Sequence, residues 1–200
     1  MNKIRMIALA ACMAATLDAA AQEQEIRLFS HRGGRMEHDE NTLSAFQASY
    51  DAGYRGFETD IRMTRDGALV ITHDSSLERT TDGTGTVEEK TEAEIRRLRT
   101  KQGNKVLFLD ELLEFLEGKE GLYVEFEMKT KPEALYPEER LHAYCDKLYD
   151  AVMAVKPADA TFVFTSGDYR GLRYLQAKHP GVDLLLITSK PCNDETIDLC

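Results

Sequence analysis

The stretch FETDIRM, residues 57–63, determines the fold that we expect for this chain. Charged side chains recur at every second position along it, at 58, 60 and 62, with the period of two that is typical of a β-strand, and Thr59 is the one polar residue at the intervening positions. Glu58 and Asp60 therefore share one face of the strand, whereas Phe57 and Ile61 lie on the other face. The stretch thus predicts a strand that presents acidic side chains on one face and core side chains on the other.

Strand-like and helix-like segments alternate on both sides of this stretch, as they do in proteins with a parallel sheet and crossover helices. Asn41 is the expected N-cap of the first helix, and Gly53 the residue that stops it. The expected strands are Ile26–Ser30, Phe57–Met63, Ala68–Thr72, Leu122–Met128, Thr161–Thr165 and Val182–Ile187. The expected helices are Thr42–Ala52, Leu109–Gly118, Glu138–Val155 and Tyr169–Lys178. Periodicity alone leaves a closed barrel and an open doubly wound sheet as alternatives.

The alternation is interrupted between Ser75 and Asn104 by a polar segment rich in Gly and Thr. One short helix is expected within it, at Glu92–Leu98. We interpret this segment as an excursion from the sheet rather than as a further strand and helix.

Composition limits the function classes that need to be considered. The chain has 200 residues, 42% of them hydrophobic and 30% charged, which is typical of one soluble globular domain. Its net charge is −10 and no basic stripe with interleaved aromatics is present, so we expect no nucleic-acid partner. The four cysteines show neither C-x-x-C nor zinc-site spacing, and an odd number of them follows residue 21, which implies no disulfide framework.

Residues 1–21 are typical of a secretory signal peptide. Lys3 and Arg5 precede an apolar run, and Ala19–Ala21 provides an A-x-A cleavage site. The run is too short to span a bilayer, so the mature domain, residues 22–200, is expected to have no integral membrane segment and to be periplasmic or extracellular. Leu9–Cys12 resembles a lipoprotein box, and lipid anchoring at Cys12 is the less favoured alternative.

Polar side chains gather at the carboxyl ends of the expected strands. His31 and Arg32 follow the first strand, His73 and Asp74 the third, and Lys129 the fourth. In (β/α) barrels the active site forms at this end of the strands. The chemistry of the chain is therefore expected to lie there.

Carboxylates are concentrated at the same end. On the fourth strand Glu125 and Glu127 share a face, as Glu58 and Asp60 do on the second. Such a group cannot stay fully ionised without a counter-charge. Ca²⁺ and Mg²⁺ take oxygen ligands of this kind, so the pattern predicts a site for a divalent cation, Ca²⁺ or Mg²⁺.

Taken together, the motifs resemble those of the glycerophosphodiester phosphodiesterase family. In order and with matching gaps they are HRG at 31–33, ENT at 40–42, ExD at 58–60, DG at 66–67, HD at 73–74, LxRTTxGxG at 77–85, ExK at 127–129 and FxS at 164–166. The resemblance covers about residues 26–190 and implies a TIM-type (β/α) barrel with a small insertion after strand three, at about residues 75–104. Counted against eight barrel strands, the chain is expected to lack the last one or two β/α units.

The resemblance also implies roles for individual residues. The metal ligands would be Glu58, Asp60 and Glu127, the acid/base pair His31 and His73, and the phosphate contacts Arg32 and Lys129. Glu40 has two open interpretations, either orienting Arg32 or a glycerol hydroxyl, or capping the loop before the first helix. Glu125 stands where relatives often have an amide.

The expected function is metal-dependent hydrolysis of small-molecule glycerophosphodiesters to glycerol 3-phosphate and an alcohol, by histidine acid/base catalysis. Two alternatives stay open. One is a non-catalytic or truncated headgroup-binding barrel, and the other is a related phospholipase-type phosphodiesterase. The sequence indicates neither the alcohol nor the oligomeric state.

Overall fold

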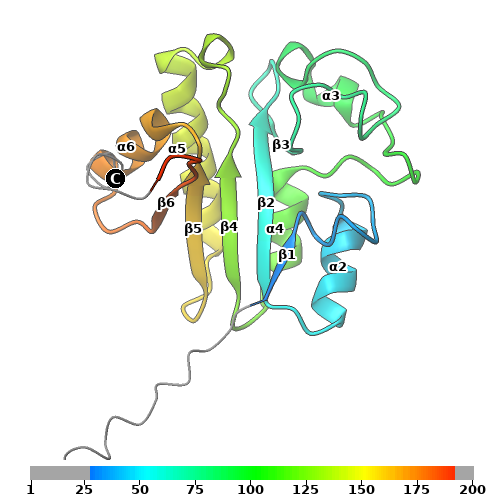
Figure 1. Cartoon of the computed structure of the whole chain (residues 1–200), viewed down its shortest axis with the longest axis horizontal. Helices are drawn as coiled ribbons and strands as arrows, with labels where there is room; N and C mark the ends of the chain where they lie inside the picture. The colour runs from blue at the N-terminus through cyan, green and yellow to red at the C-terminus, as the bar shows by residue number, and fades with distance from the viewer. Residues whose placement is uncertain (1–27, 192–200) are drawn as a thin grey trace, which may run out of the picture.

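The computed structural model describes residues 28–191, and its strands form one sheet (Figure 1). The strands are β1 (Phe29–His31), β2 (Gly56–Met63), β3 (Leu69–Ile71), β4 (Tyr123–Met128), β5 (Thr161–Ser166) and β6 (Leu184–Leu186). The order is β1-β2-β4-β5-β6, all parallel, and β3 pairs with β2 in the antiparallel direction. The proposed signal peptide, including Cys12, lies outside the described residues.

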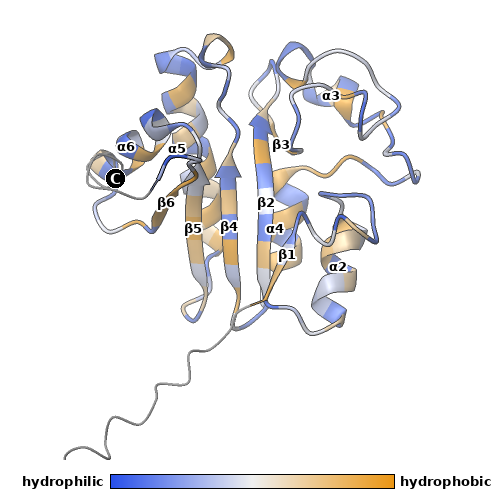
Figure 2. Cartoon of the chain, viewed as in Figure 1, coloured by the Kyte–Doolittle hydropathy of each residue, from blue (hydrophilic) through white to orange (hydrophobic). Residues whose placement is uncertain are grey.

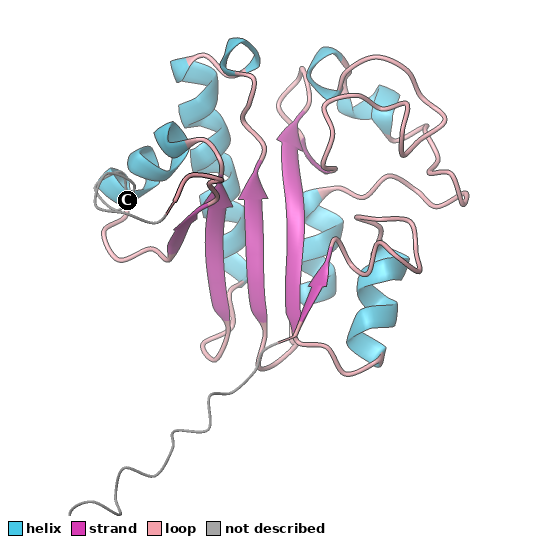
Figure 3. Cartoon of the chain, in the orientation of Figure 1, coloured by secondary structure: helices cyan, strands magenta, loops and turns pink. Residues whose placement is uncertain are grey.

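Helices cover one face of this sheet (Figure 3). Those of eight residues or more are α2 (Leu43–Asp51), α4 (Leu109–Leu116), α5 (Glu138–Val155) and α6 (Tyr169–Lys178). Helix α4 packs with one apolar face inward, because its buried leucines recur at helical spacing: Leu109, Leu112, Leu113 and Leu116. Within residues 28–191, no helix is long and apolar enough to cross a membrane.

Strand β4 separates the core from the opposite face of the sheet. Val124, Phe126 and Met128 are buried, whereas the intervening Glu125 and Glu127 are half-buried. Phe126 packs against Phe162 of β5, with the ring centroids 5.3 Å apart. Figure 2 shows the same alternation of hydrophobic and hydrophilic residues along β2 and β4. The helices therefore cover the apolar face, and the carboxylates occupy the face opposite to them.

The expected third barrel strand, Ala68–Thr72, is wrong as a parallel strand. β3 runs antiparallel to the end of β2, with Ile61 opposite Ile71 and Met63 opposite Leu69. The turn between them is tight, with the Thr64 N–H donating to the Ala68 carbonyl and Gly67 at a φ of 89°. A parallel neighbour needs a crossover of a dozen or more residues, and this connection is far shorter. The described residues therefore contain five parallel strands, not the six that were counted from the sequence.

Two smaller boundaries also differ from expectation. The first strand ends at His31, so this histidine is in the strand rather than after it, whereas the expected start at Ile26 lies outside the described residues. The N-cap of α2 is Thr42, whose side chain accepts from the Ala45 N–H, and not Asn41. Asn41 has a φ of 58° and directs its amide to Asp60 instead. This tertiary contact outweighs the local preference of Asn for capping.

The excursion between β3 and α4 packs around a small core of its own. It contains a 3₁₀ turn (Val87–Glu89) and the one-turn helix α3 (Glu92–Ile95), which begins with a capping box at Thr91. The core residues are Val70, Leu77, Val87, Ile95, Val106 and Phe108. Because Val70 belongs to β3, the hairpin joins the excursion to the sheet.

Replacing Phe126 by Ala tests the layer between sheet and helices. The ring is fully buried, so we expect the free energy of unfolding, measured by urea denaturation, to fall by about 3–5 kcal/mol. The matched control is Leu185→Ala, because Leu185 is 41% exposed and should cost less than about 1 kcal/mol. Equal losses in the two variants would contradict this assignment of the core.

Candidate active site

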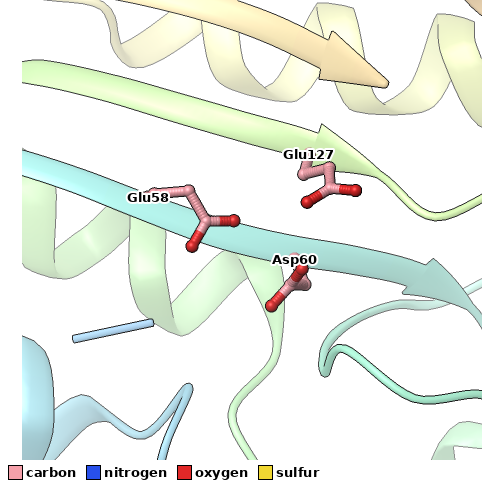
Figure 4. Close-up of side chains that lie close together, drawn as sticks. All are labelled: Glu58, Asp60 and Glu127. Carbon is pink, nitrogen blue, oxygen red and sulfur yellow. The ribbon is translucent and has the colours of Figure 1, made fainter. Parts of the chain in front are cut away.

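Three carboxylates converge on the face of the sheet that the helices leave open. β2 and β4 pair in a register that sets Asp60 opposite Glu127. The ligand oxygens of Glu58, Asp60 and Glu127 all lie within 4.8 Å of one another (Figure 4). Glu125 pairs with Glu58 along the strands but does not belong to this cluster. The three residues predicted as metal ligands are therefore brought together.

Lysine and arginine side chains supply part of the counter-charge for this cluster. Lys129 Nζ lies 2.5 Å from Glu127 Oε1 and 3.2 Å from Asp60 Oδ1. Arg32 Nε lies 3.2 Å from Asp60 Oδ2 on the other side. Both residues predicted as phosphate contacts thus border the carboxylates.

The cluster remains short of positive charge. Burial first, and then the charges of Asp60 and Glu127, raise the pKa of Glu58 to about 8. Glu58 Oε1 is buried and has no hydrogen-bond partner among the described residues, and the buried Asp60 Oδ1 has only its ion pair with Lys129. Buried oxygens without a partner are costly. A hard divalent cation fits this donor set, because it takes carboxylate oxygens and supplies the missing charge.

His31 flanks the carboxylates from the end of β1. Its Nε2 lies 3.4 Å from Glu58 Oε2. Burial, followed by the charges of Arg32 and Arg35, lowers the pKa of His31 below 6.5. The imidazole is therefore neutral at pH 7 and able to accept a proton.

His73 reaches the site because the β2–β3 hairpin reverses the chain. The Thr72 N–H donates to the Asp60 carbonyl, so His73 directly follows a residue that is hydrogen-bonded to β2 beside the carboxylates. Its Nδ1 lies 2.6 Å from Asp74 Oδ1. His73 and Glu127 both line a cavity of about 470 Å³. The cavity also has charged or hydroxyl-bearing walls at Ser75, Ser76, Lys129, Thr130, Lys131 and Asp168.

The loop after β1 is held in an unusual conformation by the same acidic groups. Arg32 has a φ of 54°, a left-handed conformation that costs a non-glycine residue about 1–3 kcal/mol. Its N–H donates to Glu58 Oε2 at 3.2 Å, and its guanidinium lies 3.2 Å from Glu40 Oε1. Gly33 follows at a φ of 74°, where an added Cβ would lie 2.9 Å from the Ala45 side chain. Glu40 is therefore hydrogen-bonded to Arg32, whereas the cap of the helix is Thr42.

Two neighbouring side chains were not identified from the sequence as part of the site. Asn41 Nδ2 donates to Asp60 Oδ2 at 2.8 Å, where the sequence suggested a helix cap. Arg62 lies two residues after Asp60, on the same face of β2, and donates to the carbonyls of His73 and Lys129. The alternation along FETDIRM carried a signal for Arg62, because it continues the row of Glu58 and Asp60.

Comparison with known proteins shows the family of the chain. The model of the glycerophosphoryl diester phosphodiesterase family matches residues 31–197. The chain belongs to this family. The resemblance inferred from the motifs is therefore confirmed.

Relatives named glycerophosphodiester phosphodiesterase match part of the chain. The protein from Caldanaerobacter subterraneus subsp. tengcongensis is 36% identical over 123 residues, which are 57% of this chain and 50% of that protein. The protein from Bacillus altitudinis is 31% identical over 111 residues, or 52% and 45% respectively. The chain spans about half the length of these curated relatives.

Solved structures confirm the barrel class of the fold. A glycerophosphodiester phosphodiesterase from Agrobacterium tumefaciens superposes with a TM-score of 0.65 at 28% identity, covering 80% of this chain and 66% of that one. An Oleispira antarctica phosphodiesterase, in complex with the product sn-glycerol-3-phosphate, gives a TM-score of 0.76 at 24% identity, covering 87% and 72%. The family fold thus extends over most of the described residues.

The raised pKa of Glu58 predicts how cation binding depends on pH. Between about pH 4.5 and 8 the folded, cation-free protein retains a proton that the unfolded chain has lost, so its stability falls as pH rises through this window. A cation replaces that proton. At a concentration about 100-fold above Kd, Mg²⁺ or Ca²⁺ should raise Tm by about 5–10 °C at pH 8, and by less at pH 5.5.

Thermal unfolding with and without the cation at both pH values measures this difference. Asp60→Asn should lose most of the stabilisation, because it removes one of the three ligands. A Tm increase that is the same at pH 5.5 and pH 8, or that survives in Asp60→Asn, would contradict the assignment of the cation to this cluster.

Proposed function

We propose that this chain hydrolyses glycerophosphodiesters to glycerol 3-phosphate and an alcohol in a reaction that depends on a divalent cation. The observation that carries the proposal is the convergence of Glu58, Asp60 and Glu127 within 4.8 Å, bordered by His31. Membership in the glycerophosphoryl diester phosphodiesterase family supports the same reaction. On the pattern of residues 1–21 alone, we also propose that the chain is exported.

The charges around the cluster suit a phosphodiester. The substrate carries a negative charge that repels an attacking hydroxyl, and more charge accumulates on the phosphoryl oxygens in the transition state. Lys129 and Arg32 would face these oxygens and neutralise part of it. When bound by Glu58, Asp60 and Glu127, Mg²⁺ or Ca²⁺ supplies Lewis-acid stabilisation of the same charge.

The two histidines divide the proton transfers in this proposal. The lowered pKa of His31 keeps its ring neutral, so His31 accepts the proton of the attacking hydroxyl. That hydroxyl comes from water or from the neighbouring glycerol carbon. A new P–O bond forms, the bond to the alcohol breaks, and His73 protonates the departing oxygen. Each such transfer typically contributes about 10²–10⁴-fold to the rate.

The alternative of a phospholipase-type enzyme is less well supported by the cavity. Among the described residues that line it, only Met128 has an apolar side chain, and Met128 is buried in the core. An acyl chain gains about 0.8 kcal/mol per CH₂ only where it contacts apolar surface. A small polar alcohol therefore fits this cavity better than a lipid chain.

Release of glycerol 3-phosphate from glycerophosphocholine by the purified chain tests the proposed reaction. Turnover should require Mg²⁺ or Ca²⁺ and stop with EDTA. The His31→Asn and His73→Asn variants should each lower kcat by about 10²–10⁴-fold. For the wild type, kcat/KM should rise with pH along a limb centred below pH 6.5, because the His31 base must be neutral.

If the folded protein binds the cation but shows no turnover, the proposed hydrolysis is wrong and the headgroup-binding alternative is supported. Substantial turnover by both histidine variants would instead reject the acid/base assignment. Circular dichroism on each variant separates these outcomes from loss of folding.

Substrate choice is tested by replacing glycerophosphocholine with lysophosphatidylcholine below its micellar concentration. Because the cavity offers polar walls, we expect kcat/KM to favour glycerophosphocholine by about tenfold or more. A preference for the acylated substrate would support the phospholipase-type alternative.

A further inference from the structure

We propose that Arg79, contributed by the excursion, is a positioning residue that holds the His73 imidazole in one orientation through Asp74 and ties it to Arg32 through Glu40. This inference rests on the proposed function for its catalytic consequence. Its structural part, the orientation of a histidine ring, stands independently of turnover.

The first link joins Arg79 to His73. Asp74 uses both of its carboxylate oxygens, with Oδ1 2.6 Å from His73 Nδ1 and Oδ2 hydrogen-bonded to Arg79 Nε. The hydrogen bond from Arg79 is the largest cause that lowers the pKa of Asp74 to about 2. An ionised carboxylate only accepts hydrogen bonds. The proton of neutral His73 is therefore held on Nδ1. The second proton of the acid form is then carried on Nε2, from which it is donated to the departing oxygen, and the ring returns to the Nδ1–H tautomer.

The second link joins Arg79 to the opposite side of the site. Its two terminal nitrogens donate to both oxygens of Glu40, at 2.9 and 2.7 Å, in the fork geometry that only Arg provides. Glu40 also accepts from Arg32, whose guanidinium lies 3.2 Å from Asp60. A continuous row of charged groups thus runs from His73 to the carboxylate cluster, and Arg79 is its centre.

The backbone around Arg79 is anchored well enough to support this role. Leu77, two residues before it, is buried in the small core of the excursion. The carbonyl of Leu77 accepts from the Thr81 N–H at 3.0 Å and from Thr81 Oγ1 at 2.7 Å. The turn that presents Arg79 is therefore fixed on both sides.

The Arg79 side chain is nevertheless about half exposed, at 48%. Exposed ion pairs contribute little to stability, so Arg79→Ala is expected to stay folded. Its effect should appear in the orientation of His73. Groups that orient a functional histidine typically change activity by about 10–100-fold when they are lost.

Kinetics and NMR of the whole chain test the proposal together. In Arg79→Ala, kcat for glycerophosphocholine should fall by about 10–100-fold, with a smaller change in KM. In wild-type protein without substrate, the ¹⁵N signals of His73 should report the Nδ1–H tautomer of the neutral ring, and in Arg79→Ala a mixture of tautomers. Arg79→Lys keeps the charge without the fork, so it should fall between the two.

The matched control is Arg96→Ala. Arg96 is a partly exposed arginine of the excursion that pairs with Glu92, Asp110 and Glu111, away from the site. It should leave kcat and the His73 signals unchanged. A folded Arg79→Ala protein with wild-type kcat and a single Nδ1–H tautomer would overturn the proposal, and so would equal losses in Arg96→Ala.

If wild-type protein shows no turnover, the proposed function fails, and the NMR comparison alone decides the role of Arg79. Loss of the single tautomer in Arg79→Ala then supports the positioning role, and its persistence overturns it.

Discussion

Mutual repulsion among Glu58, Asp60 and Glu127 is the constraint on which the rest of the site depends. Their ligand oxygens lie within 4.8 Å of one another on the open face of β2 and β4. Burial and this repulsion raise the pKa of Glu58 to about 8. A sheet can maintain such an arrangement only if cations are fixed beside it. Lys129 comes from the end of β4 and Arg32 from the loop after β1, and both face Asp60.

This constraint also explains features that would otherwise be costly. The left-handed backbone of Arg32 places its N–H on Glu58 and its guanidinium beside Asp60. Asn41 gives up a helix-capping position to donate to Asp60. Both conformations lower local stability, and both bring a hydrogen-bond donor or positive charge to the carboxylates. Strain at the edge of the sheet is thus offset by electrostatic interactions at its centre.

Period-two alternation was sufficient to predict that Glu58 and Asp60 share a face, and helical spacing located α2, α4, α5 and α6 to within a few residues. The direction of β3 was missed, although the four residues between Met63 and Ala68 leave no room for a crossover. The role of Asn41 could not be read locally, because Asn41 and Thr42 are both good caps and a distant aspartate decides between them. The link from Arg79 to Glu40 joins residues 39 positions apart, which no local pattern reports.

The hairpin formed by β2 and β3 separates the excursion from the order of the parallel strands. β3 pairs with β2, the strand that directly precedes it, and His73 lies just after the end of β3, before the excursion begins. The next parallel strand, β4, pairs directly with β2, whatever lies between them in the sequence. The excursion can therefore change in length or composition while the pairing of β2 with β4 stays the same. Apart from Arg79, which contacts Asp74 and Glu40, residues 75–104 could change with little effect on the carboxylate cluster.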